Sequence, residues 1–390
     1  YRFVVLFFNC LLTFGSYFCF DIPSVLQDQF QGVSIRNPTC RPLAYLPFAH
    51  FVTLCILCFF LPFILPVGLF LFSFLTVLGS TIFALGSHFK GTPYLLPLML
   101  TGRLLFGSGN GSLTIVQNRI TAFWFKGKEL ALAFGLTLSF SRLGSVLNFF
   151  LTKSKKIALT SLLHASEKTV QSNWISCHLG TILCVLGFFS AITVSALDKV
   201  GMKQLGLEGA IQRVQDIRRL PLRYWLLVLT IMFFYNGVFP FVADASKFIQ
   251  DKYEGYDQQT ASYIAGAVYD SSLVLSAIVG ILIDYVGMRG ILAVLCAVMT
   301  LPVFALLAFT YVPPLVSTLW LGVTYSFAAA SMWPSIPLVV PQATLGTAMG
   351  LATSVQMIGI GLSNLIVGRI LGTKSRFFLQ MVVCACITLN

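Results

Sequence analysis

The sequence predicts an all-α membrane protein that crosses the bilayer many times and consists of two similar helical bundles. Hydrophobic residues make up 57% of the chain and charged residues only 10%, with a mean hydropathy of +0.87. A soluble protein carries about a quarter charged residues. A spanning helix needs about 20 apolar residues, so the 390 residues accommodate roughly twelve spans. The apolar runs are continuous rather than alternating, which argues against a β-barrel.

The first half of the chain accounts for six of these spans. The first runs from about Phe3 to beyond Asp21 and is broken by Pro23. Between residues 43 and 87 there is no Asp, Glu, Lys or Arg, and that length suits two spans. Three more are expected at 93–123, 129–152 and 174–197, the last two separated by a loop rich in Lys, Ser and Thr.

The chain changes character at residues 199–219, where basic residues outnumber acidic ones and no long apolar run occurs. We interpret this segment as a cytosolic linker between an N-terminal bundle, residues 1–198, and a C-terminal bundle, residues 220–390. Further spans are expected at 224–248, 260–283, 291–309, 315–339 and 344–371. A last helix begins near residue 377 and stops at Asn390, so we expect it to be clipped. Two six-helix bundles are the layout of transporters built from repeats.

The charge balance and the motif content exclude several other classes of protein. The net charge is +12, but the Lys and Arg residues lie mainly in loops, as is usual for membrane proteins, so we predict no nucleic-acid partner. The spans contain no paired Asp motif, no His–Glu–His metal spacing and no matching Ser and His. We therefore predict no enzymatic activity, no metal and no cofactor, and a lipid bilayer as the surrounding medium.

The charged residues inside apolar spans include Arg103, Arg142, Asp21 and Asp270. A charge in the bilayer is expensive and usually faces a cavity, a partner or a substrate. Arg142 lies in the middle of its span, and a guanidinium can hold a carboxylate through two hydrogen bonds. We predict that Arg142 anchors a substrate carboxylate, with a structural ion pair as the alternative.

One face of the fourth span is polar. Arg103, Asn110, Thr114 and Gln117 recur at i, i+7, i+11 and i+14, a spacing that places them on one side of a helix. This face either lines the cavity between the bundles or forms a ladder of hydrogen bonds with a neighbouring helix.

The loop between the eighth and ninth spans reads G-I-L-I-D-Y-V-G-M-R-G, from Gly280 to Gly290. The first Gly permits a close helix approach, Asp284 can cap a neighbouring helix, and Arg289 completes a charge relay at the turn. We expect Gly280, Asp284, Arg289 and, in span four, Arg103 to have gating or structural roles. The corresponding stretch of the first half, residues 61–72, contains no Asp or Arg.

Several motifs in order along the chain resemble a known family. They are G-S-Y-F-C-F-D-I-P from Gly15, G-R-L-L-F-G-S-G-N-G-S from Gly102, W-F-K-G-K-E-L from Trp124, V-F-P-F from Val238, M-W-P from Met332 and L-G-T-A-M-G from Leu345. Together with the Gly280 loop they resemble the lysosomal dipeptide transporters of the major facilitator superfamily.

The resemblance implies a multi-pass protein of the lysosomal membrane that exports dipeptides by facilitated diffusion, beside a glycosylated single-pass accessory protein. Arg142 falls at the position of that family's carboxylate-binding Arg. The family's amine-binding Glu falls at Gly111 or Asn110, and neither side chain can carry a charge. We therefore expect Asp270, or alternatively Asp21, to receive the substrate's ammonium group.

The leading prediction is thus a uniporter of dipeptides that works by alternating access. The alternatives are a transporter of organic anions or other small solutes, and a membrane scaffold or sensor that transports nothing. The remaining candidate substrate contacts are polar or aromatic residues of the spans, namely Tyr17, Asn110, Gln117, Tyr235, Tyr269, Trp333 and Gln356.

Overall fold

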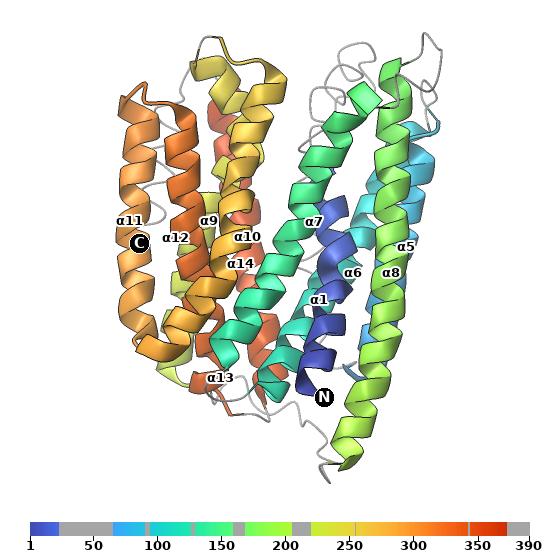
Figure 1. Cartoon of the computed structure of the whole chain (residues 1–390), viewed down its shortest axis with the longest axis vertical. Coiled ribbons are helices and arrows are strands. Elements are labelled where there is room, and N and C mark those ends of the chain that lie inside the picture. Colours follow the sequence, from blue (N-terminus) through green and yellow to red (C-terminus); the bar gives the residue numbers. More distant parts are fainter. Residues whose placement is uncertain are drawn as a thin grey trace.

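The computed structural model describes residues 1–22, 65–89, 94–125, 129–158, 168–204, 220–253, 255–341 and 344–372. Every regular element within these ranges is a helix, and the helices run nearly parallel along the long axis of the molecule (Figure 1). The spans expected within 43–64 and after residue 373 lie outside the described ranges.

Among the described residues, the first half of the chain contributes five long helices: α1 (Arg2–Phe20), α5 (Leu65–Gly86), α6 (Leu95–Trp124), α7 (Leu130–Ala158) and α8 (Lys168–Gln204). Helices α7 and α8 both extend into the stretch expected to be a loop. Lys and Ala are good helix formers, so the segment after residue 152 continues α7 to Ala158. Helix α8 likewise continues through residues 199–204 of the expected linker, and residues 205–219 lie outside the described part.

The second half contributes α9 (Leu222–Lys252), α10 (Gln258–Val286), α11 (Arg289–Phe309), α12 (Pro314–Met332) and α14 (Leu345–Gly372). The short 3-10 helix η4 (Trp333–Ser335) and the single turn α13 (Ile336–Val339) extend the end of α12. Gly287 has φ of +72°, and its amide bonds the carbonyl of Ile283 at 2.9 Å. A glycine in this left-handed conformation ends α10 and permits the tight turn into α11.

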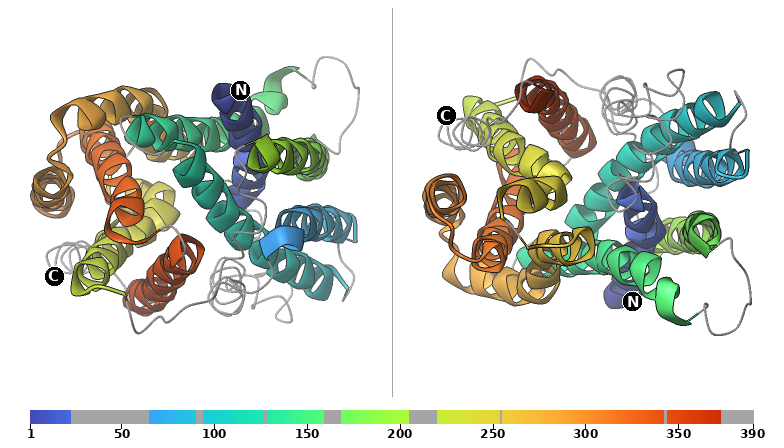
Figure 2. Two further views of the ribbon diagram at one scale, coloured as in Figure 1. Left: turned by 90° about the horizontal axis from the view of Figure 1, so that it is seen from below. Right: turned by 90° about the horizontal axis from the view of Figure 1, so that it is seen from above.

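The helices of the first and second halves form two groups, seen from either end in Figure 2. Helix α7 of the first group packs against α10 of the second. Among the described residues, nine helices are long and apolar enough to cross a membrane. Helix α6 is not one of the nine despite its 30 residues, because Arg103, Asn110, Gln117 and Arg119 lower its hydropathy. The predicted fold class, an all-α polytopic membrane protein, is confirmed.

The two groups meet most closely where α7 crosses α10, and glycines permit this approach. A Cβ on Gly135 of α7 would lie 2.4 Å from the carbonyl oxygen of Ser276 on α10. A Cβ on Gly280 would lie 2.6 Å from the carbonyl oxygen of Ala131 on α7. Both distances are too short for any side chain, so the crossing requires glycine on each helix.

Candidate substrate site

Arg142 of α7 lies at the contact between the two helix groups. Its side chain is only 3% exposed. Its Nη2 donates a hydrogen bond to the hydroxyl of Tyr325, which lies on α12. Helix α7 belongs to the first half and α12 to the second, so this bond joins the two halves of the protein.

Three tyrosine rings enclose the guanidinium of Arg142. Its Cζ lies 4.9 Å from the ring centroids of Tyr269 and Tyr325 and 5.7 Å from that of Tyr17. A cation within about 6 Å of an aromatic face is attracted by the ring quadrupole. Tyr17 comes from the first half and the other two from the second, so both halves stabilise the same positive charge.

The guanidinium retains unused hydrogen-bonding capacity. Its Nε is buried and has no hydrogen-bond partner within the described part of the chain. The Nε and Nη2 hydrogens point along the same edge of a guanidinium, and this edge matches the two oxygens of a carboxylate. Within the described structure, Nη2 therefore has an acceptor on this edge, the hydroxyl of Tyr325, and Nε has none.

Asp21 is the acid of this region. It is 4% exposed, follows the last residue of α1, and lies within electrostatic range of both Arg142 and Arg103, with Ser145 as a polar neighbour. A basic and an acidic group in one buried region are complementary to a small zwitterion, which carries a carboxylate and an ammonium group.

An aromatic cluster of the second half adjoins the site through Tyr325. The rings of Tyr235 and Phe239 stack 5.6 Å apart, and Tyr325 meets both edge-on at 5.8 and 6.4 Å. The indole Nε1 of Trp333 donates to the hydroxyl of Tyr235 at 2.9 Å. These side chains fix the position of the Tyr325 ring beside Arg142.

The structure does not bring Asp270 into this cluster. Asp270 follows Tyr269 on α10 and shares a helix face with Tyr263, Val274 and Ile281, at i−7, i+4 and i+11. These three side chains are 37%, 62% and 57% exposed, so the face points outward from the described bundle. The expectation that Asp270 receives a substrate amine beside Arg142 is not supported by this placement, because neighbouring helix positions differ by about 100° in direction.

Arg103 is buried to the same degree as Arg142, but both of its terminal nitrogens bond backbone carbonyls. Its Nη1 donates to the carbonyl of Cys19 at 3.0 Å and its Nη2 to that of Phe20 at 3.1 Å. The rings of Phe83 and Phe106 lie 4.9 and 5.5 Å from its Cζ. Arg103 thus caps the C-terminal end of α1, where carbonyls lack intrahelical partners and a positive charge is favourable.

Gln117 belongs to a hydrogen-bond ladder between α6 and α1. Its Nε2 donates to the carbonyl of Asn9 at 2.7 Å, and its Oε1 accepts from the hydroxyl of Thr13 at 3.1 Å. Of the two roles expected for this face of the fourth span, Gln117 therefore has the second, a hydrogen-bond ladder with a neighbouring helix. Asn110 and Gln356 are both buried, on α6 and α14. The side-chain oxygen of Asn110 has no partner among the described residues.

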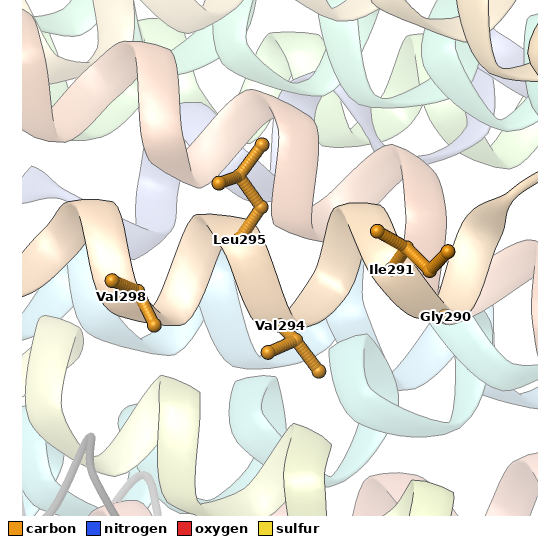
Figure 3. Close-up of a pocket in the computed structure, with 5 residues that line it drawn as sticks. All are labelled: Gly290, Ile291, Val294, Leu295 and Val298. Carbon is orange, nitrogen blue, oxygen red and sulfur yellow. The ribbon is translucent and has the colours of Figure 1, made fainter.

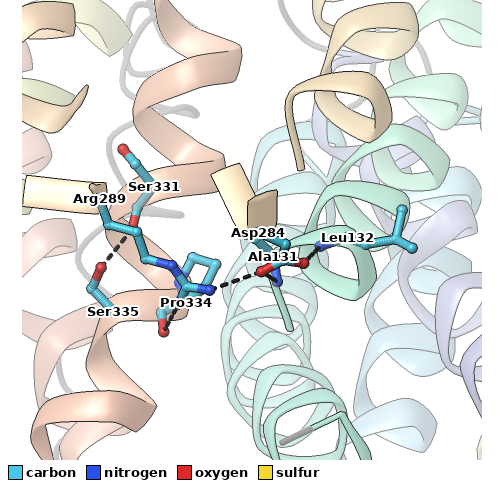
Figure 4. Close-up of polar contacts among 7 residues, drawn as sticks. All are labelled: Ala131, Leu132, Asp284, Arg289, Ser331, Pro334 and Ser335. Atoms are coloured by element: carbon cyan, nitrogen blue, oxygen red, sulfur yellow. Dashed lines mark hydrogen bonds and ion pairs between the residues drawn. The ribbon is translucent and has the colours of Figure 1, made fainter. Parts of the chain in front are cut away.

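A network centred on Asp284 joins the halves at the other end of α7 (Figure 4). Its carboxylate accepts from the amides of Ala131 and Leu132 at 3.1 and 2.9 Å. Arg289 donates to Asp284 at 2.8 Å and to the carbonyl of Pro334 at 3.1 Å. Asp284 therefore caps the first turn of α7 from the opposite half, and Arg289 connects this cap to the end of α12.

The outer surface of α11 differs sharply from this interface. Gly290, Ile291, Val294, Leu295 and Val298 line a hollow along the helix, and their side chains are apolar (Figure 3). Val294 and Ile291 are 63% and 66% exposed, which is the property of a helix face in contact with acyl chains. No group of three or more His, Cys, Asp or Glu side chains within the described ranges could hold a metal ion.

Tyr325 is the site residue that sequence reasoning missed. Tyr17, Tyr235 and Tyr269 were candidates because they are aromatic and polar within spans, and Tyr325 has the same properties. In that span, Trp333 is the candidate contact predicted from the sequence. Only the packing shows that, of the tyrosines beside Arg142, it is Tyr325 whose hydroxyl receives the hydrogen bond from Nη2.

Two helical groups with a buried cation held between them, and with a charged cap across their crossing, define a membrane transporter of the two-bundle class. The sequence model of the Major Facilitator Superfamily matches residues 62–364. The chain belongs to this superfamily.

The chain is similar to curated proteins over its whole length. It is 35% identical over 401 residues to the lysosomal dipeptide transporter MFSD1 of Homo sapiens, covering 100% of this chain and 84% of that protein. It is 33% identical over 399 residues to the same transporter of Danio rerio, covering 99% and 84%.

Solved structures of transporters share the fold. The proton:xylose symporter XylE matches with a TM-score of 0.71 at 12% identity, covering 100% of this chain and 94% of that chain. The transporter FucP in its outward conformation matches with a TM-score of 0.65 at 14% identity, covering 100% and 97%.

Proposed function

We propose that this protein is a uniporter that moves dipeptides across the lysosomal membrane by alternating access. The observation that carries the proposal is Arg142, a buried guanidinium whose Nε has no hydrogen-bond partner among the described residues and whose surrounding tyrosines come from both halves. A site at the junction of two bundles can be exposed to either side of the membrane when the bundles rock. The similarity to the MFSD1 transporters supports the substrate class and the membrane.

In this proposal Arg142 binds the peptide carboxylate and Asp21 receives the ammonium group. Arg103 is excluded from substrate binding because its nitrogens already hold the end of α1. Because the described part of the site offers a cation, Arg142, together with a nearby acid, Asp21, it fits a zwitterion better than an organic anion. The aromatic cluster around Tyr235 then lies where it can contact a substrate side chain.

The network of Asp284 and Arg289 would form the gate on the side of the linker. Trp124, the last residue of α6, donates to Asp198 of α8 at 3.0 Å, so the C-terminal end of α6 and the residue before the expected linker lie at one end of the molecule. We propose that this end is cytosolic, and that a glycosylated single-pass accessory protein accompanies the transporter in the membrane.

A transport assay tests the proposal directly. The purified full chain is reconstituted into liposomes preloaded with unlabelled alanyl-alanine, and uptake of labelled alanyl-alanine by exchange is measured. We expect exchange that does not require a pH gradient, and that is inhibited strongly by free dipeptides but only weakly by alanyl-alanine amide, which lacks the carboxylate. Inhibition by the amide as strong as by the free acid would contradict the role of Arg142.

A further inference from the structure

We propose that the hydroxyl of Tyr325 occupies the substrate's place on Arg142, and that a substrate carboxylate displaces it. This inference rests on the proposed role of Arg142. It adds a residue that sets affinity and couples binding to the contact between the halves. Three observations carry it. Nη2 of Arg142 donates a hydrogen bond to Tyr325, Nε of Arg142 has no hydrogen-bond partner among the described residues, and both the Arg142 and the Tyr325 side chains are buried.

The geometry of the guanidinium decides where a carboxylate can bind. Nε and Nη2 offer two parallel N–H groups on one edge, and a carboxylate bound there accepts both hydrogen bonds. In this structure Nε has no partner among the described residues, whereas Nη2 donates to Tyr325. A carboxylate that uses this edge must therefore take the place of the phenol oxygen on Nη2.

The exchange favours the carboxylate because a charged acceptor binds a guanidinium more strongly than a neutral hydroxyl does. In the protein without substrate, the phenol oxygen nevertheless stabilises the site, because it accepts a hydrogen bond from Nη2, a buried donor that would otherwise lack this acceptor. Tyr325 is 4% exposed and fixed by the rings of Tyr235 and Phe239, so its hydroxyl is held in position beside Arg142.

Displacement also breaks a bond between the two halves. Arg142 lies 11 residues after Ala131 on α7, which corresponds to about 17 Å along the helix at about 1.5 Å per residue. Ala131 belongs to the Asp284 network, and Pro334 of that network directly follows Trp333, whose indole holds Tyr235. A carboxylate that releases Tyr325 thus breaks a bond between α7 and α12, the two helices whose ends the network of Asp284 and Arg289 connects.

The test compares two substitutions that each remove one buried phenol oxygen. Tyr325→Phe removes the hydroxyl on Arg142. Tyr224→Phe is the matched control, because the Tyr224 hydroxyl is buried and, among the described residues, bonds the carbonyl of Ala348 at 2.8 Å instead of Arg142. The dissociation constants of alanyl-alanine and of alanyl-alanine amide are measured by calorimetry on the purified full chain.

We expect Tyr325→Phe to tighten binding of alanyl-alanine by about three- to tenfold, the effect of removing one competing hydrogen bond. Binding of the amide should not change, and Tyr224→Phe should match the wild type for both ligands. In exchange assays KM should fall together with the maximal rate, since a more tightly held substrate leaves more slowly. A loss of packing alone would not lower KM.

Weaker or unchanged binding of the free acid by Tyr325→Phe would overturn the inference, because the hydroxyl would then contact the substrate or be irrelevant. If this variant folds poorly, Tyr325→Met, which also lacks the hydroxyl, must show the same tightening. Arg142→Lys separates the two proposals. Wild-type affinity in Arg142→Lys overturns the proposed function itself, whereas a loss of affinity there with no gain in Tyr325→Phe overturns only the displacement.

Discussion

Arg103 and Arg142 are both 3% exposed and both lie under aromatic rings, yet their surroundings assign them different tasks. Arg103 donates to two backbone carbonyls at the end of α1, all within one half of the protein. Arg142 donates to one phenol from the other half and keeps its Nε unused within the described structure. Burial of a cation therefore does not identify a binding site. The identity and the origin of its partners do.

We expect the largest effect from substitution of Arg142, whose Nε has no hydrogen-bond partner among the described residues. Arg142→Ala should abolish dipeptide exchange and Arg142→Lys should reduce it severely, because Lys offers a point charge instead of a two-pronged edge. Loss of the charged partner should cost about 2–5 kcal/mol of substrate affinity. Exchange and thermal unfolding are measured together. A folded Arg142→Ala protein with normal exchange would remove the distinction between the two arginines.

Arg103 should behave in the opposite way. Arg103→Ala leaves two carbonyls of α1 without a partner and removes a cation from two phenylalanine rings. The protein should lose about 2–4 kcal/mol of stability, seen as a lower midpoint of thermal unfolding. The fraction that remains folded should bind alanyl-alanine with wild-type affinity. A stable Arg103→Ala protein with weakened binding would instead place Arg103 in the substrate site.

Two of the acids in the spans, Asp21 and Asp270, extend the comparison. Asp21 lies near both arginines, whereas Asp270 shares an outward face of α10 with exposed apolar residues. Asp21→Asn should weaken alanyl-alanine more than tenfold and spare its N-acetyl derivative, which has no ammonium group. Asp270→Asn should change neither affinity. The reverse pattern in calorimetry would restore Asp270 as the amine receptor.

The smallest effect is expected at a second helix cap. Lys252 donates to the carbonyls of Leu307, Ala308 and Thr310 at the end of α11, as Arg103 does for α1. Lys252 is only partly buried, so water can replace it. Lys252→Met should lower stability by about 0.5–1 kcal/mol without any change in dipeptide affinity. A loss of stability as large as that of Arg103→Ala would show that solvent exposure does not reduce the contribution of such a cap to stability.

The sequence by itself determined the class of protein, the positions of the described spans and the presence of buried charges. Apolar runs of spanning length leave few alternatives in lipid, because only a helix satisfies its own backbone there. The spacing of Gly280, Asp284 and Arg289 likewise predicted a helix cap at a tight turn. The tight turn depends on local geometry alone, whereas the helix that Asp284 caps, α7, is set by the packing of the two halves.

Only the tertiary structure decided which polar groups meet. Gln117 lies on the same helix face as Arg103, but its contacts with Asn9 and Thr13 depend on how α1 packs against α6. Asp270 and Tyr269 are adjacent in sequence and point in different directions. Tyr325 reaches Arg142 across 183 positions of sequence, and no local pattern encodes that distance. Helix periodicity determines which face a residue occupies, whereas the packing of the two halves determines what that face contacts.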